Sequence, residues 1–190
     1  MEYKDIFPIL LSYKKLDKIL ADSLEERFLP WLEKLQLDGS YADHRHSDYW
    51  EQKIPVGEIA PELIEEFILA FRDYAEKTDF KIDEAKGLDI WTQDYQEGEG
   101  HDMHGHGSSG ISGVYWVRAN ENAGSLRFYN PNQIAELVPN TNPNNFYTVG
   151  QAEVPVEKGG LLLFPSYLKH KVVIDGENAV RTTIAVNISE

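Results

Sequence analysis

Three histidines and one arginine in the second half of the chain have the side-chain types and spacing of a metal-dependent active site. They are His104, His106, His170 and Arg181. His104 and His106 are two residues apart, so both leave the same face of an extended backbone and can converge on one ion. His170, from another predicted strand, would complete a facial set of ligands that leaves coordination positions open for chemistry. We therefore expect these four residues to be catalytic.

The segment that follows Gly87 must position these side chains, and its pattern predicts strands. Short apolar runs alternate with turns rich in Gly, Asn, Pro and Asp, and no helical pattern lies between them. Such runs imply antiparallel pairing in a closed or doubled sheet, here a jelly-roll barrel. The candidate strands are Leu88–Tyr95, Gly100–His106, Ile111–Arg118, Ser125–Tyr129, Phe146–Val149, Val154–Val156, Gly160–Phe164, His170–Ile174 and Val180–Ile188.

The first part of the chain has helical periodicity and is expected to support the barrel. Apolar residues recur at three- and four-residue steps over Leu16–Leu37, where Pro30 should break or kink the helix, and again over Glu58–Lys77. An apolar run at Ile6–Ser12 suits an edge strand. We expect a single, mainly β domain, in which residues 1–86 supply two supporting helices and residues 87–190 form the catalytic core.

The last predicted strand separates two kinds of side chain. One face carries Arg181, Thr183, Ala185 and Asn187, and the other carries Thr182, Ile184, Val186 and Ile188. Because the second face is mostly apolar, we expect the helices to pack on it. The first face should then line a polar cavity.

The short segment Asp175–Asn178 is expected to form a hairpin loop. With that register His170 faces Thr183, and Arg181 lies diagonally from His170 at roughly 7 to 8 Å between backbone positions. This separation would suit a small dianion that chelates a metal at one end and meets the guanidinium at the other.

Composition limits the classes of partner. The 190 residues include 18 Lys and Arg against 32 Asp and Glu, a formal charge of −14. Such a surface repels phosphate backbones and anionic membranes, so we expect neither nucleic acid nor a membrane as partner. The chain has no cysteine, so a metal must be held by histidines and carboxylates.

Charged residues interrupt the apolar residues of Met1–Leu20. This pattern predicts neither a signal peptide nor a membrane span, so a cytoplasmic protein is expected. The sequence indicates no oligomeric state.

The second half of the chain contains a series of motifs in a fixed order. They are Tyr95-x-x-Gly98, His104-x-His106, Ser112-Gly113-Val114-Tyr115, Gly124-Ser125-Leu126-Arg127-Phe128, Gly159-Gly160-Leu161-Leu162-Leu163-Phe164-Pro165-Ser166, His170 and Arg181-Thr182-Thr183. Taken in this order, the motifs resemble the 2-oxoglutarate and Fe(II)-dependent oxygenase superfamily. The resemblance extends roughly from Leu88 to Ser189. Within the superfamily the order looks like the prolyl-hydroxylase-like branch, and it is most similar to short oxygenase-like proteins of bacteria and phages.

This resemblance implies a double-stranded β-helix, cupin-like, that binds Fe(II) through the histidines and 2-oxoglutarate through Arg181. Thr183 and Tyr95 are further candidates for binding the co-substrate, although the Tyr95 ring could equally fill the barrel mouth. The implied reaction consumes O2, releases succinate and CO2, and hydroxylates a peptidyl (prolyl-like) or small amino-acid-like substrate.

One position departs from the superfamily pattern. His106 stands where the superfamily usually has Asp or Glu, so the predicted iron site would contain three neutral imidazoles. Asp102 shares strand parity with His104 and His106, and it is the alternative ligand if the backbone bulges.

Other interpretations remain open at this point. A three-histidine, cupin-type dioxygenase would not use 2-oxoglutarate, and a non-catalytic jelly-roll module would hold a structural zinc, with Asp102 as fourth ligand. Arg181 could instead pair with an acidic residue in a structural ion pair. His44-x-His46 has the same spacing as the candidate pair but is expected to lie in a loop. Residues 107–110 and 130–145 are candidate lids over the site.

Overall fold

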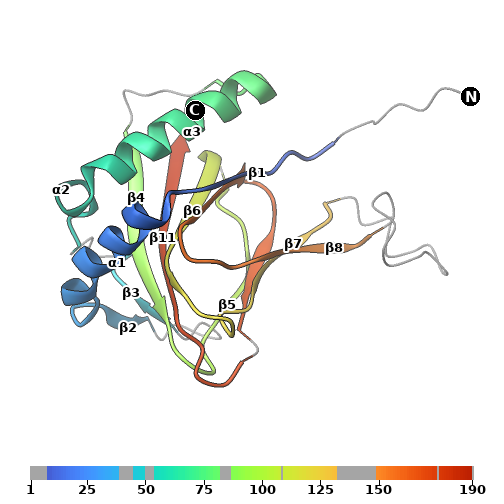
Figure 1. Ribbon diagram of the computed structural model, residues 1–190. Coiled ribbons are helices and arrows are strands. Elements are labelled where there is room, and N and C mark those ends of the chain that lie inside the picture. Colours follow the sequence, from blue (N-terminus) through green and yellow to red (C-terminus); the bar gives the residue numbers. More distant parts are fainter. Residues whose placement is uncertain are drawn as a thin grey trace, which may run out of the picture.

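The computed structural model describes residues 8–38, 45–49, 54–81, 87–107, 109–131, 149–174 and 176–189. These residues form two antiparallel sheets and three helices, which confirms the expected mainly β jelly-roll class with N-terminal helices (Figure 1). The helices are α1 (Lys18–Leu32), α2 (Val56–Ile59) and α3 (Pro61–Thr78). The strands are β1 (Ser12–Lys15), β2 (Gln36–Asp38), β3 (Arg45–Ser47), β4 (Leu88–Tyr95), β5 (His101–His104), β6 (Ser109–Ala119), β7 (Ser125–Tyr129), β8 (Gln151–Pro155), β9 (Gly160–Pro165), β10 (His170–Val173) and β11 (Arg181–Ser189).

The two sheets are layered, and the helices cover one of them. The larger sheet has the order β1-β9-β6-β11-β4-β3-β2, and the smaller has the order β5-β10-β7-β8. In Figure 1, α1 and α3 lie against the larger sheet, and β5, β7 and β8 lie on its other side. Strands from the first 86 residues, β1 to β3, are hydrogen-bonded into the larger sheet.

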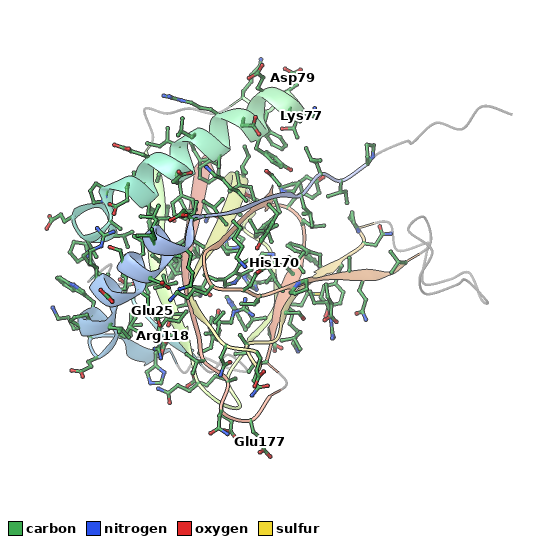
Figure 2. All side chains as sticks on the ribbon, viewed as in Figure 1. Glu25, Lys77, Asp79, Arg118, His170 and Glu177 are labelled. Carbon is green, nitrogen blue, oxygen red and sulfur yellow. The ribbon has the colours of Figure 1, made fainter. Side chains whose placement is uncertain are left out.

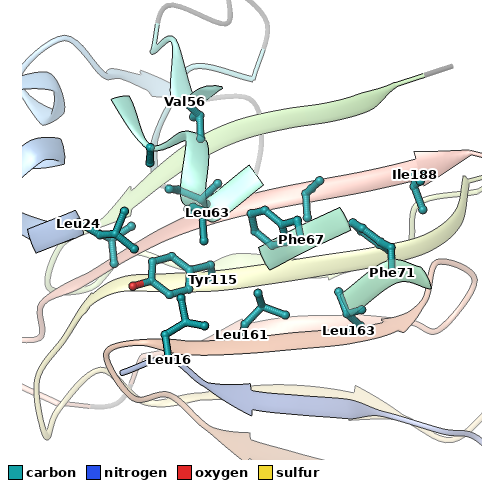
Figure 3. Close-up of a cluster of buried hydrophobic side chains, with 14 of the residues drawn as sticks. Leu16, Leu24, Val56, Leu63, Phe67, Phe71, Tyr115, Leu161, Leu163 and Ile188 are labelled. Atoms are coloured by element: carbon teal, nitrogen blue, oxygen red, sulfur yellow. The ribbon is translucent and has the colours of Figure 1, made fainter. Parts of the chain in front are cut away.

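Helix α3 packs on the larger sheet because one of its faces is apolar. Leu63, Phe67 and Phe71 recur every four residues and are fully buried. Figure 3 shows these side chains over Leu161 and Leu163 of β9. Pro61 occupies the first turn, where its missing N–H costs no hydrogen bond.

The outer face of β11 completes this core. Ile184, Val186 and Ile188 are buried in the same cluster as the helix side chains. The expected packing of the helices on the apolar face of the last strand is therefore confirmed.

Helix α1 is shorter than its periodicity predicts. The Asp17 side chain accepts a hydrogen bond from the backbone N–H of Ile19 at 2.8 Å and so caps the start of the helix. Pro30 lies in the last turn, and the helix ends at Leu32 instead of Leu37. The residues Gln36–Asp38 form β2, because pairing with β3 replaces helical hydrogen bonds at this point.

Two further expectations about the front of the chain need correction. Pro8–Leu11 is not a strand, and the edge strand that pairs with β9 is Ser12–Lys15. His46 lies in strand β3 next to β4, and not in a loop. Residues 1–7 and His44 lie outside the described part of the chain, as do residues 132–148, which include most of one candidate lid and of the strand expected at Phe146–Val149.

The predicted hairpin between the last two strands is wrong. β10 pairs with β5 and β7 in the smaller sheet, whereas β11 pairs with β4 and β6 in the larger one. His170 is therefore opposite His104 and Phe128, and Arg181 is opposite Tyr95 and Ala119. The short connection crosses from one sheet to the other, and its length alone does not distinguish a crossover from a hairpin.

Among the described residues, no helix is both long and apolar enough to cross a membrane.

Candidate functional site

The inner faces of the two sheets line a pocket that lies between them. The larger sheet contributes Arg181, Thr183 and Ala185 from β11, as the strand parity predicts. The smaller sheet contributes His104 and His170. Figure 2 shows His170 between the layers, near the middle of the molecule, whereas Glu25 and Arg118 lie on the side of helix α1.

The pocket brings the three predicted histidines together. His104 ends β5, His106 follows just beyond that strand, and His170 begins β10. One ring nitrogen from each lies within 4.8 Å of the others, and the Nε2 atoms of His106 and His170 are 3.3 Å apart. With metal–nitrogen distances of about 2.1 Å, two neighbouring ligands at a right angle would be about 3 Å apart. The spacing therefore fits one metal ion.

Hydrogen bonds fix the ring orientation of two of these histidines. The Nδ1–H of His104 donates to the carbonyl oxygen of Asp102 at 2.7 Å, and the Nδ1–H of His170 donates to that of Leu168 at 2.9 Å. Each bond leaves Nε2 as the ring nitrogen that could bind a metal. The Nδ1 of His106 faces instead the side-chain amide of Asn187, at 3.3 Å.

Burial keeps the imidazoles of His106 and His170 neutral, which is the form that binds metals. Burial, with a smaller effect of the nearby His104, lowers the pKa of His106 from 6.5 to about 4. The same two causes lower the pKa of His170 to about 3. Both rings are therefore uncharged at neutral pH.

The alternative ligand Asp102 lies away from this group. Its side chain is more than half exposed and forms an ion pair with Lys171 at 3.3 Å. Among the described residues, the group that could hold a metal ion contains three histidines and no carboxylate. A zinc site completed by Asp102 would require that side chain to leave Lys171 and turn inward.

Arg181 is a buried cation at the other side of the pocket. It is 1% exposed, and its Nη1 donates to the carbonyl oxygen of Ser125 at 3.0 Å. Among the described residues, its Nε has no hydrogen-bond partner and no carboxylate lies within ion-pair distance of the guanidinium. Burial lowers the pKa of Arg181 to about 10. A buried guanidinium without a carboxylate suits an anionic ligand better than the structural ion pair.

The two other candidate co-substrate residues flank this arginine. The guanidinium lies over the ring of Tyr95, at 5.4 Å from the ring centroid, and the Tyr95 hydroxyl donates to Oε1 of Gln93 at 3.0 Å. The Oγ1 of Thr183 is buried and has no hydrogen-bond partner among the described residues. Two polar atoms, Arg181 Nε and Thr183 Oγ1, are thus left for a ligand.

Two polar pocket residues, Gln93 and His101, were not among the site residues predicted from the sequence. Gln93 shares strand parity with Tyr95, which could have placed it in the pocket. His101 stacks on His104 with ring centroids 3.6 Å apart, although a separation of three positions would place them on opposite faces of a regular strand. An irregularity in the pairing of β10 with β5 changes the side-chain alternation there, and strand parity alone does not predict it.

Comparisons with known proteins agree with this geometry. A family model described as "Putative 2OG-Fe(II) oxygenase" matches residues 89–187, just over half of the chain. A prolyl-4-hydroxylase from Pseudomonas putida has a similar structure, with a TM-score of 0.70 and 14% sequence identity over 95% of this chain and 92% of that chain. A search of curated proteins returned no match.

Two more solved structures share the fold. A prolyl hydroxylase from Trichoplax adhaerens, in complex with a peptide fragment of a hypoxia-inducible factor, has a TM-score of 0.66 and 14% identity over 94% of this chain and 83% of that chain. A non-heme, alpha-ketoglutarate-dependent epimerase of nogalamycin biosynthesis has a TM-score of 0.58 and 15% identity over 94% and 76%. Because the sequence identities are only 14–15%, these matches show that the fold is shared and nothing beyond it.

Proposed function

Because the chain belongs to the 2OG-Fe(II) oxygenase family, we propose that the pocket between its two sheets is the active site. The protein is an oxidoreductase, a dioxygenase that uses Fe(II) and 2-oxoglutarate. When bound, the iron and 2-oxoglutarate activate O2 for substrate oxidation, with release of succinate and CO2. The protein's own contribution is to bind, orient and shield these groups.

In this proposal His104, His106 and His170 hold the iron through their Nε2 atoms. The single observation that carries the assignment is the convergence of their ring nitrogens within 4.8 Å inside the pocket. A facial set of three ligands leaves room for 2-oxoglutarate and O2. The set carries no negative charge, unlike one that includes a carboxylate.

Arg181 is the proposed partner of the far carboxylate of 2-oxoglutarate. Its Nη1 is held by Ser125, which fixes the plane of the guanidinium and leaves Nε for the ligand. The hydroxyl of Thr183 can donate a second hydrogen bond, and the ring of Tyr95 supports the guanidinium from below. The Tyr95 hydroxyl, already bonded to Gln93, is assigned a supporting role.

The proposed prime substrate is a peptidyl, prolyl-like residue or a small amino-acid-like molecule. The shared fold with two prolyl hydroxylases supports this class. Within the chain, Trp91 lies 5.9 Å from the His106 ring and packs edge-on against the partly exposed Tyr49 at 5.1 Å. This aromatic wall would favour an apolar ring or alkyl group beside the metal. The proposed location is cytoplasmic, where 2-oxoglutarate and ferrous iron are both supplied.

An anaerobic titration tests the proposal. Addition of Fe(II) and then 2-oxoglutarate to metal-free protein should produce the visible charge-transfer absorption of the chelate, and admission of O2 should then yield succinate. The matched control is His46→Ala, a histidine in β3 outside the metal group, which should behave as the wild type. Absence of both signals from the wild-type protein would overturn the assignment.

A further inference from the structure

Asn187 links the pocket to two buried serines behind it. Its Oδ1 accepts a hydrogen bond from Ser112 Oγ at 2.7 Å, and Ser112 Oγ lies 2.8 Å from Ser166 Oγ. On its other side, the Nδ2 of Asn187 is 3.3 Å from the Nδ1 of His106. All three polar side chains are at least nine-tenths buried. They form a continuous row, the Asn187 row (Asn187, Ser112 and Ser166), that ends on a proposed iron ligand.

The hydrogen bonds of the Asn187 row continue through His106 and His170, and each residue donates to the next one toward Leu168. Because His170 uses its Nδ1–H on Leu168, its Nε2 is an acceptor and receives the Nε2–H of His106. The Nδ1 of His106 is then an acceptor too, and it receives an N–H of Asn187. In this arrangement every donor between Ser112 and the carbonyl oxygen of Leu168 has an acceptor.

Coordination of a metal is incompatible with that arrangement. A ring that binds through Nε2 carries its proton on Nδ1, which would then face the amide N–H of Asn187, donor against donor. A half-turn of the Asn187 amide resolves the conflict: Oδ1 accepts from His106, and Nδ2 donates to Ser112. The hydroxyl of Ser112 can reverse as well, because a serine both donates and accepts. The two ends of an amide are nearly equal in size, so no backbone movement is needed.

We propose that Asn187 is the positioning residue for His106, and that metal binding is coupled to a tautomer change of His106 and a reversal of the Asn187 amide. The other two ligands have no such freedom, because backbone carbonyls fix their tautomers. Asn187 supports the one histidine that stands where the superfamily usually has a carboxylate. This inference rests on the proposed ligand set.

Nuclear magnetic resonance of ¹⁵N-histidine-labelled protein gives a direct test, with Zn(II) as the diamagnetic probe. The proton of His106 should be on Nε2 in metal-free protein and on Nδ1 after zinc binding, whereas His104 and His170 should keep theirs on Nδ1. A His106 tautomer that is the same in both samples would overturn the proposal. This measurement needs no variant and no activity.

Two substitutions separate positioning from folding. Asn187→Leu keeps the shape but removes the acceptor and should weaken zinc binding about 10- to 100-fold. Asn187→Asp restores an acceptor and should bind zinc at least as tightly as the wild type. A metal-free Asn187→Leu variant that melts with the wild type and binds zinc equally well contradicts the proposal. If His170→Ala also leaves zinc affinity unchanged, the ligand set itself is wrong.

Discussion

The Nε2 atoms of His106 and His170 meet at 3.3 Å although 64 positions separate the two residues in the chain. The turn that follows β9 forms hydrogen bonds with both histidines. The carbonyl oxygen of Ser166 accepts the backbone N–H of His106 at 2.9 Å, and that of Leu168 accepts the ring Nδ1–H of His170 at 2.9 Å. The distance between two proposed ligands thus depends on two residues, Ser166 and Leu168, that do not themselves bind the metal.

Removal of one imidazole should abolish most of the metal affinity. A partner outside the ligand set is worth about 10- to 100-fold in affinity, so loss of a ligand in His170→Ala should cost more than about 100-fold. Isothermal titration with Zn(II) or anaerobic Fe(II) measures the effect. His46→Ala, which removes a histidine paired with Glu99 at 3.3 Å, should leave the affinity unchanged. Equal affinities for the two variants would contradict the assignment.

The stability of the metal-free protein should fall in acid because of the buried histidines. In the folded protein the pKa of His106 is about 4 and that of His170 is about 3, both below the ordinary value of 6.5. The unfolded chain therefore binds more protons between these values, and the stabilisation present above pH 6.5 is lost as the pH falls through the folded pKa values. Urea denaturation as a function of pH gives the free energy of unfolding.

Carboxylates titrate in the same range, so a variant must isolate the histidine effect. His106→Gln removes one of the two groups and should flatten the slope by up to about 1.4 kcal/mol per pH unit between pH 6.5 and 4. Identical slopes for variant and wild type would show that His106 is not buried as a neutral imidazole.

Arg181→Met should separate ligand binding from stability. Loss of the guanidinium should weaken 2-oxoglutarate binding by about 2–5 kcal/mol, the cost of truncating one partner of a buried charge pair. Without ligand the variant should be about as stable as the wild type or more stable, because a desolvated cation with no carboxylate is removed. Calorimetric titration and thermal melting measure the two effects.

A surface arginine serves as the control for that substitution. Arg127 lies on β7 and pairs with Glu153 at 2.7 Å, outside the pocket. Arg127→Met should leave 2-oxoglutarate affinity unchanged and alter stability by less than about 1 kcal/mol. The assignment of Arg181 fails if both variants bind 2-oxoglutarate equally.

Gly124→Ala should be severely destabilising, for a backbone reason. Gly124 has φ +73°, and a Cβ there would lie 1.9 Å from the carbonyl oxygen of Val173. Gly98 also has a positive φ, +78°, but no atom of the described residues lies within 4 Å of its added Cβ. Gly98→Ala should therefore cost only about 1–2 kcal/mol for the left-handed backbone. We expect Gly124→Ala to exceed about 3 kcal/mol in denaturant unfolding, and similar losses for both would refute the clash.

Much of the fold follows from local sequence patterns. The predicted bounds of Leu88–Tyr95 and Ser125–Tyr129 match the structure, and the two faces of β11 pack as their side chains predict. Local alternation suffices there because one face of each strand meets a core and the other meets the pocket.

Pairing between strands was harder to predict than the strands themselves. The sequence placed His170 and Arg181 in one hairpin, whereas they lie in opposite sheets. β2 lies at the end of a segment with helical periodicity, so the pattern did not predict a strand there. β3 is stabilised by pairing with β2 and β4, and not by a β propensity of its own sequence. Partner choice depends on contacts between distant segments, and the spacing within one segment does not encode it.

The placement of Arg181 on one sheet and of His104 and His170 on the other has a mechanical consequence. A dicarboxylate that reaches from the metal to the guanidinium would link the two sheets non-covalently. Separation of the sheets would then require loss of the contacts between the ligand and one sheet, or release of the ligand. Amide protons of β10 and β11 should therefore exchange more slowly, and with more similar rates, when the dicarboxylate is bound.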